Sequence, residues 1–418
     1  MTALQMSSAS SIGMPSQWSL LLSDLLKSIE EHTMSYADKV RLRCVCASWR
    51  SQLPKLHDHP IGTRLPWLLV PFNDNLDSKG ASKFYDPLEK KLYELDHLPE
   101  AEEKALFKGS TQGGWVVVAE TGDKIYVVNP LTRARFQLPP RSKFPDVRKY
   151  RANKHDNEYL IREPHDFNEY YQMDATHLRN YFLPKVVLSP STCDSTDFIA
   201  VAIYGEIGRL AYCRRGDKKW HVLSEEFTYS DVRFHEQVLY AVEFNGRLLA
   251  FDFNTNASCP KPKEIEIVAP FPTPLTGQLY LVWCSGGIIM VRRDTDLDDE
   301  AYDQDVRISV TLGFNIFKLD STSDDGKGKW CEVESLGDHV LFLGLNSSTA
   351  FSCRDFPGCF KGNQIYCTDD NVSADAKGSG RLFDQGVYSL DEKVFERFPA
   401  YVGDTRQVWP APIWIMPK

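Results

Sequence analysis

FYDPLEKKLYEL at residues 84–95 and VVNPLTRARFQL at residues 127–138 are the two stretches that decide the fold. Each reads as a strand, a polar turn with Asp-Pro-Leu or Asn-Pro-Leu and a basic residue, and a second strand with an aromatic residue and Leu. Pro87 and Pro130 lie 43 positions apart. A strand–turn–strand unit that returns after about 40 to 50 residues is typical of propeller blades.

Looser copies of this unit follow along the chain. The turn GDKKW (216–220) resembles GKGKW (326–330), since each is a polar turn before a strand that opens with Trp, and DEKVF (391–395) has the same form. We therefore predict a mainly β fold, a propeller of about six blades, or seven if residues 141–181 contribute one. The predicted blades cover about 67–99, 112–140, 183–223, 233–270, 278–336 and 338–399.

Segment 141–181 decides between six and seven blades. It is polar, rich in Lys, Arg, Tyr and His, and shows no strand alternation, so it is either a degenerate blade or a long loop between blades. The last stretch, RQVWPAPIWIMP (406–417), is predicted to pair with the first blade. Such a pairing would leave no sheet edge of the ring open.

Residues 16–56 differ from the rest, because their apolar residues recur at helical spacing. The apolar residues at i, i+3, i+4 and i+7 are Leu22, Leu25, Leu26 and Ile29 in a first helix and Leu42, Val45, Cys46 and Trp49 in a second. About 40 residues is close to the lower limit for an independent core, so we expect this module to dock on a partner. The predicted organisation is a disordered lead at 1–15, the helical module at 16–56, a linker at 57–66 and the propeller at 67–416.

Composition excludes several classes of protein. The chain has 418 residues, with 48 Lys and Arg against 57 Asp and Glu, and its formal charge of −9 repels nucleic-acid backbones. No run of about 18 apolar residues is present, which argues against a membrane span. The ten Cys are scattered, and the N-terminus has no secretory pattern. We therefore expect a protein of the cytoplasm, the nucleus or both.

The helical module resembles the F-box. In WSLLLSDLLKSIEEHTMSYADKVRLRCVCASWRSQL (18–53), Trp18, the Asp24-Leu25-Leu26 run, Ile29 and Trp49 occupy positions that this motif expects. The rest of the chain is similar to plant F-box proteins with a KIB-type β-propeller. The stretches that carry this similarity are NPLTR (129–133), KVVLSP (185–190), RLAYCRRGDKKW (209–220), YLVWCSGGIIMVRR (280–293), WCEVESLGDHVLFLG (330–344) and NQIYCTDD (363–370).

The resemblance implies a substrate receptor of an SCF-type (Skp–cullin–F-box) ubiquitin ligase, whose F-box binds the Skp adaptor and whose propeller binds a protein target. Such a receptor performs no chemistry, because it only holds a target lysine near the charged ubiquitin carrier. Trp49 is expected to be an internal anchor. The implied adaptor contacts are Trp18, Leu21, Leu22, Leu25, Leu26, Ile29, Val40, Leu42 and Val45.

Two other functions remain open. The family's Leu-Pro near the F-box start is replaced by Leu21-Leu22, so the F-box could have decayed in a protein that still binds a target through its propeller. A propeller hydrolase is the third hypothesis, although no GxSxG elbow and no phosphate-binding Gly loop occurs.

The basic stretch RSKFPDVRKYRANK (141–154) is the candidate target-contacting loop. Its six Lys or Arg are interleaved with two aromatic residues, a combination that nucleic-acid binding also uses. The simplest interpretation is a solvated loop, and the alternative is a loop that binds an acidic or phosphorylated protein target. We expect no nucleic-acid partner. The residues concerned are Arg141, Lys143, Arg148, Lys149, Tyr150 and Arg151.

Two further patterns partly resemble metal sites. The run DTDLDDEAYDQD (294–305) spaces its acids like a calcium loop, but Asp299 stands at the sixth position, where that loop needs Gly for its turn. We predict a solvated hairpin loop there instead. His57 and His59 lack a third ligand nearby for zinc. We therefore expect no metal, no cofactor and no catalytic residue.

Overall fold

The computed structural model forms two compact units, Met1–Leu65 and Pro66–Lys418. The predicted lead at 1–15 and residues 57–64 of the predicted linker lie outside the residues that it describes. The described residues are 17–33, 36–54, 65–70, 82–95, 106–111, 113–120, 122–152, 158–163, 166, 168–190, 198–224, 229–254, 262–265, 267–268, 277–303, 306–320, 328–368, 385–398 and 412–416.

The first unit is a small helical module. A 3₁₀ turn, η1 (Gln17–Leu20), precedes the helices α1 (Ser23–Glu31), α2 (Tyr36–Cys44) and α3 (Ala47–Gln52). The prediction of one continuous second helix is wrong, because the chain leaves the helical conformation before Ala47. Cys46 is extended, with φ −160°, and its Sγ accepts the backbone N–H of Trp49 at 3.5 Å, so this side chain caps α3.

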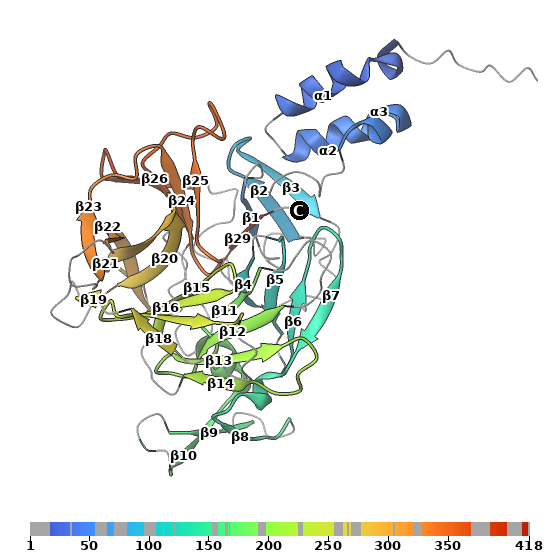
Figure 1. The fold of residues 1–418 in the computed structure, drawn as a ribbon. Helices are drawn as coiled ribbons and strands as arrows, with labels where there is room; N and C mark the ends of the chain where they lie inside the picture. Colours follow the sequence, from blue (N-terminus) through green and yellow to red (C-terminus); the bar gives the residue numbers. More distant parts are fainter. Residues whose placement is uncertain are drawn as a thin grey trace, which may run out of the picture. The chain divides into compact units, whose positions relative to one another are not determined.

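The described residues of the second unit form seven sheets, of which six make up a propeller (Figure 1). Blades 1 to 3 consist of β1 (Trp67–Val70), β2 (Ser82–Asp86), β3 (Lys91–Leu95) and β29 (Ile413–Ile415); β4 (Leu106–Ser110), β5 (Val116–Ala119), β6 (Ile125–Val128) and β7 (Arg135–Leu138); and β11 (Lys185–Leu188), β12 (Ile199–Tyr204), β13 (Arg209–Arg214) and β14 (His221–Ser224).

Blades 4 to 6 complete the ring. They consist of β15 (Tyr229–His235), β16 (Val238–Glu243), β17 (Leu248–Asp252) and β18 (Pro262–Ile265); β19 (Ile267–Val268), β20 (Gln278–Cys284), β21 (Gly287–Asp303), β22 (Val306–Asp320) and β23 (Gly328–Val333); and β24 (His339–Leu343), β25 (Thr349–Ser352), β26 (Gln364–Cys367), β27 (Gly386–Ser389) and β28 (Val394–Arg397). The inner strands β29, β4, β11, β15, β20 and β25 contact one another in that order. The ring is therefore built from six blades.

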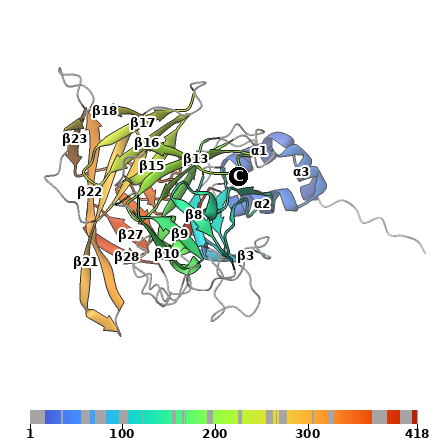
Figure 2. The same cartoon turned by 90° about the horizontal axis from the view of Figure 1, so that it is seen from below.

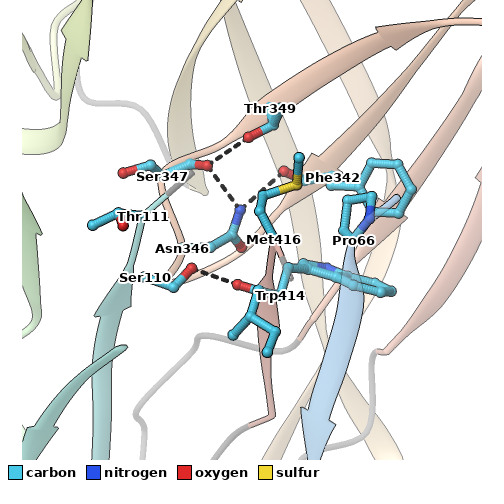
Figure 3. Close-up of a pocket in the computed structure, with 10 residues that line it drawn as sticks. Pro66, Ser110, Thr111, Phe342, Asn346, Ser347, Thr349, Trp414 and Met416 are labelled. Atoms are coloured by element: carbon cyan, nitrogen blue, oxygen red, sulfur yellow. Dashed lines mark hydrogen bonds between the residues drawn. The ribbon is translucent and has the colours of Figure 1, made fainter. Parts of the chain in front are cut away.

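The last strand closes the ring, as the sequence predicts. β29 pairs antiparallel with β1, with Trp414 opposite Leu68. The Oγ of Ser110 in blade 2 donates to the Trp414 carbonyl (Figure 3). On the other side, the rings of Trp414 and Phe342 of blade 6 lie 5.0 Å apart. Blade 1 thus joins the two ends of the propeller in one sheet.

The turn that repeats in the sequence has the same structure at both places. The Oδ1 atoms of Asp86 and Asn129 each accept the backbone N–H groups two and three residues further on, at 2.9 to 3.2 Å. The basic residues that end the two turns, Lys90 and Arg133, have φ of 52° and 61°. The Asx side chain satisfies the turn's backbone donors, and the Pro that follows it presets its own φ. The turn is therefore specified locally.

The repeated Trp has a packing role between blades. The indole Nε1 of Trp220 in blade 3 donates to the carbonyl of Pro139 after blade 2, at 2.9 Å. The Nε1 of Trp330 in blade 5 donates to the carbonyl of Gly246 in blade 4, also at 2.9 Å. Both Trp side chains are buried. Each of these two Trp side chains thus joins its blade to the preceding one.

Segment 141–181 is neither a blade nor a loop. It forms η4 (Arg141–Lys143), a separate sheet of β8 (Val147–Tyr150), β9 (Tyr159–Arg162) and β10 (Tyr170–Met173), then α4 (Ala175–His177) and a π turn, η5 (Leu178–Phe182). A Cβ on Gly109 of β4 would lie 1.8 Å from the carbonyl oxygen of Val186 in β11. Blades 2 and 3 are therefore in direct contact, and the three-stranded insertion lies outside the ring.

A buried ion pair connects four blades at the centre of the ring. The Nζ of Lys185 in β11 lies 2.7 Å from Oδ1 of Asp231 in β15, and it donates to the carbonyl of Gly344, just after β24, at 3.3 Å. The Oδ2 of Asp231 accepts the backbone N–H of Leu281 in β20 at 2.8 Å. The central strands are thus held by charge-assisted hydrogen bonds.

The hairpin of β21 and β22 is longer than its blade and extends beyond the neighbouring sheets (Figure 2). β20 pairs with β21 as far as Arg293, whereas β21 and β22 continue to pair from Asp294 to Asp298 and pair again at Asp303 with Val306, after a shift of register. The prediction of a hairpin loop at 294–305 is therefore wrong as far as Asp303, because β21 extends to that residue, and residues 304–305 lie outside the described residues. Asp294 forms an ion pair with Arg292, at 2.8 Å between Oδ1 and Nε.

Candidate functional site

The helical unit has a small core of its own. Leu26, Trp49 and Leu53 are at most 6% exposed, and Leu21, Leu42 and Cys46 pack against them half-buried. The Nε1 of Trp49 donates to the backbone carbonyl of Trp18 at 2.7 Å, which ties η1 to α3. The prediction that Trp49 is an internal anchor is therefore confirmed.

Several large apolar side chains of this unit remain outside its core. Their exposed fractions lie between 42% and 71%, and they are Trp18, Leu20, Leu22, Leu25, Ile29 and Val45. Leu22, directly before α1, lies on one stripe with Leu25 and Ile29 of α1, because residues that follow at 100° per position return to the same side after seven residues. Contiguous exposed apolar groups, such as this stripe, mark an interaction surface. We call these six residues the apolar surface of the helical unit.

The structure places the remaining predicted contact residues elsewhere. Leu26 is fully buried, so the prediction that it contacts a partner directly is wrong. The buried residues of α1 are Leu26 and Glu30, so the core of the unit lies on this side of the helix. The other apolar residues of the stripe face away from the core. Val40 lies in α2, and its side chain is outside the description.

Leu20 belongs to the apolar surface and was missed in the sequence. It is 71% exposed and lies in the 3₁₀ turn η1, where the 3.6-residue period does not apply. Its position two residues after Trp18, in the same short apolar segment, is the signal that could have identified it.

The basic stretch of the insertion lies in and around strand β8. Tyr150 pairs with Tyr159 of β9, and the register shifts between Val147 and Lys149. This β-bulge leaves both Arg148 and Lys149 exposed, although neighbours in a regular strand point to opposite faces. The prediction of a loop is therefore wrong for Arg148, Lys149 and Tyr150, which lie in the edge strand β8. Lys143 lies in the 3₁₀ turn η4, and Arg151 directly follows β8.

The predicted residues of this stretch separate into exposed and buried groups. Lys143, Arg148, Lys149 and Arg151 are exposed. Tyr150 is half-buried, with its ring 4.6 Å from that of Tyr159. We call the four exposed cations the basic edge.

Arg141 cannot contact a partner directly, which corrects its prediction. It is fully buried, and its Nη2 donates to the carbonyl of Glu120 at 2.8 Å. Burial is also the main reason that the pKa of its guanidinium is lowered.

Metal sites and membrane spans are not apparent in the described part of the chain. There, no three His, Cys, Asp or Glu side chains come together in a way that could hold a metal ion. Among the described helices, none has both the length and the apolar character needed to cross a membrane.

The model of the KIB1-4 beta-propeller family matches residues 84–389, from the start of the repeated turn motif to the end of β27. The chain belongs to this family. The F-box protein SKIP23 of Arabidopsis thaliana is 24% identical to this KIB1-4 propeller protein over 95% of each chain. The putative F-box protein At1g65770 of the same plant is 26% identical over 91% of this chain and 98% of the relative. These alignments reach into the helical unit, and the names of these relatives support an F-box substrate-adaptor role in general.

Proposed function

We propose that this chain is the substrate-recognition subunit of an SCF-type ubiquitin ligase, in which the helical unit binds a Skp-type adaptor and the propeller binds a protein target. The observation that carries the proposal is the apolar surface of the helical unit. Leu22, Leu25 and Ile29 contribute little to the unit's own core, yet they form a continuous stripe on α1. Burying such a stripe against a partner is favourable by about 25 cal/mol for each Å² of apolar surface.

The backbone at Leu22 supports a docking-competent F-box despite the missing Pro. Leu22 has φ −60° and ψ 139° directly before α1. Proline holds φ near −65° and adopts the same extended conformation. The backbone before α1 therefore has the conformation that Pro would impose. Leu in place of Pro makes the unfolded chain less rigid, but it does not prevent the backbone conformation needed for binding.

For the target, the basic edge of the insertion is the surface that we propose. Its four exposed cations stand on a chain with a net charge of −9, so they form a local positive field on an acidic protein. Such a field attracts acidic or phosphorylated segments, and arginine binds their oxygens in a bidentate way. β8 is also at the edge of its sheet, where an extended segment could add as a further strand.

No catalytic group is needed for this role. Ubiquitin transfer is accelerated when the target lysine is held near the activated carrier, and a six-bladed ring with a buried central ion pair is a rigid support for that purpose. Within this chain, the function is therefore binding and positioning.

Co-purification of the full chain with a Skp-type adaptor and a cullin tests the ligase role. We expect a stoichiometric complex. If the folded chain binds none of the Skp-type adaptors while it still captures its target, the F-box has decayed and the ligase proposal is wrong.

Charge reversal on the insertion tests the target surface. Arg148→Glu with Lys149→Glu should reduce capture of a target at least about tenfold, because favourable charge contacts become repulsive. The matched control is Lys318→Glu with Lys329→Glu, two exposed lysines of blade 5. Equal capture by both double variants would exclude the basic edge as the target site.

A further inference from the structure

A serine, a histidine and an aspartate meet at the junction of blades 5 and 6. Ser285 lies in the turn between β20 and β21, and Asp338 and His339 lie at the start of β24. The Oγ of Ser285 is 3.2 Å from Nε2 of His339, although the two residues are 54 positions apart. The Nδ1 of His339 is 3.0 Å from Oδ1 of Asp338. A hydroxyl, an imidazole and a carboxylate in this order can make a serine nucleophilic.

The contacts of His339 determine which of its ring nitrogens accepts a proton. Its Nδ1 faces the carbonyl oxygen of Leu336, at 3.2 Å, as well as the carboxylate of Asp338. Both groups are acceptors only, so the neutral ring carries its proton on Nδ1. Nε2 then accepts the hydroxyl of Ser285. His339 is therefore placed as a general base for this hydroxyl.

The carboxylate of Asp338 is held by two further groups. Its Oδ2 accepts the hydroxyl of Ser352 in β25 at 2.8 Å and lies 2.9 Å from Nε of Arg354. The hydrogen bond from Ser352 is the main reason that the pKa of Asp338 is lowered. The carboxylate is therefore negative at neutral pH, where it orients the imidazole and stabilises the imidazolium formed during proton transfer.

The hairpin of β20 and β21 presents the Ser285 hydroxyl to solvent. Cys284 pairs with Gly287, so Ser285 and Gly286, with φ of 51° and 76°, form the tip of this hairpin. Both tip residues are exposed. The backbone N–H of Gly286, directly after the serine, donates no hydrogen bond within the described part of the chain. In hydrolases with a serine nucleophile, an N–H at this position helps to bind the oxyanion.

We propose that Ser285, His339 and Asp338 form a nucleophilic centre that hydrolyses small carboxylic esters. Nε2 of His339 takes the proton of Ser285 as Oγ bonds to the ester carbonyl carbon, and it gives this proton to the departing alcohol oxygen. Nε2 then takes a proton from water, whose oxygen attacks the acyl carbon. The bond from the acyl carbon to Oγ breaks, Oγ recovers the proton, and the carboxylic acid leaves.

The open position of the centre selects the class of substrate. Small esters with a good leaving group reach an exposed serine, whereas amides have a poorer leaving group and depend more on a complete oxyanion hole. The proposal is independent of the ligase function, because neither the apolar surface nor the basic edge contributes a residue to it.

Labelling of the full chain with a rhodamine fluorophosphonate tests the nucleophile, because this reagent bonds to activated serines. We expect stoichiometric labelling of Ser285, identified by peptide mass spectrometry, and turnover of 4-nitrophenyl acetate. Ser285→Gly should abolish both, and glycine tolerates the positive φ of this turn. His339→Gln should lower the labelling rate at least about a hundredfold, since it removes the general base.

His221→Gln is the matched control for His339→Gln. His221 of blade 3 also faces an aspartate, with Nε2 3.8 Å from Oδ2 of Asp217. This variant should label like the unmodified chain. Failure of the unmodified chain to label, labelling that persists in Ser285→Gly, or equal labelling rates in His339→Gln and His221→Gln would overturn the proposal.

Asp338 acts as a positioning residue, and Asp338→Asn separates this role from a structural one. Asn keeps the shape of the side chain, but its neutral amide no longer holds His339 in the required tautomer. We expect kcat for 4-nitrophenyl acetate to fall at least about tenfold with an unchanged KM, and Tm to stay within about 2 °C. An unchanged kcat in the folded variant would contradict the role of Asp338.

Discussion

The double substitution Leu25→Asp with Ile29→Asp tests the apolar surface of the helical unit most directly. The two side chains are 53% and 42% exposed, so about half of each is available for burial against an adaptor. Complete burial of such a side chain contributes about 1.5 to 3 kcal/mol, which makes the lost burial about 1 kcal/mol at each position. A carboxylate that enters an apolar interface without a partner costs about 1 kcal/mol more, at the least. The total of about 4 kcal/mol corresponds to a rise in Kd of roughly a thousandfold.

Interferometry with a purified Skp-type adaptor and the full chain measures this change. Because both residues lie outside the core, the double variant should keep its helical circular dichroism, with a change in unfolding free energy within about 0.5 kcal/mol for each position. Val394→Asp is the matched control, since Val394 is 56% exposed but belongs to the propeller. A folded double variant whose Kd changes less than about threefold would refute the assignment of this surface.

Three more outcomes follow from buried groups. Trp49→Phe removes the N–H that donates to the Trp18 carbonyl and should destabilise the helical unit by about 1 to 2 kcal/mol, measured as a lower urea midpoint; an unchanged midpoint would contradict the anchor role. Lys185→Met leaves Asp231 buried without its cation and should cost about 3 to 5 kcal/mol, of which the further change Asp231→Leu recovers part; equal stability of the two variants would contradict this. Lys108 of the folded chain is neutral above about pH 7, whereas in the unfolded chain it stays protonated up to its ordinary pKa of 10.5. Between these two pH values the unfolded chain binds one more proton, so the free energy of unfolding should rise with pH by at most about 1.4 kcal/mol for each pH unit. Lys108→Met should lack this rise, and an equal slope in both proteins would exclude Lys108 as its cause.

The blade pattern could be predicted because its signals are local. The Asx-Pro-Leu turn satisfies its own backbone donors through Asp86 or Asn129, so the same residues form the same turn wherever they occur. The closing strand was also predictable, since an apolar segment at the end of the chain has to be covered. The position of segment 141–181 outside the ring was not predictable from the sequence. It follows from the direct contact of Gly109 with Val186, which depends on how two whole blades pack.

The candidate sites show the same division between local and non-local information. The spacing of Leu22, Leu25, Leu26 and Ile29 determined that α1 has one apolar stripe. Only the tertiary structure decided that the core lies beside Leu26 and leaves the others exposed, because periodicity gives the angle between side chains and not the position of the neighbouring helix. For Arg141, the sequence determined a positive charge among other positive charges. Its burial was decided by segments far away in the chain, which place the carbonyl of Glu120 and the charges of Lys108 and Arg179 around it.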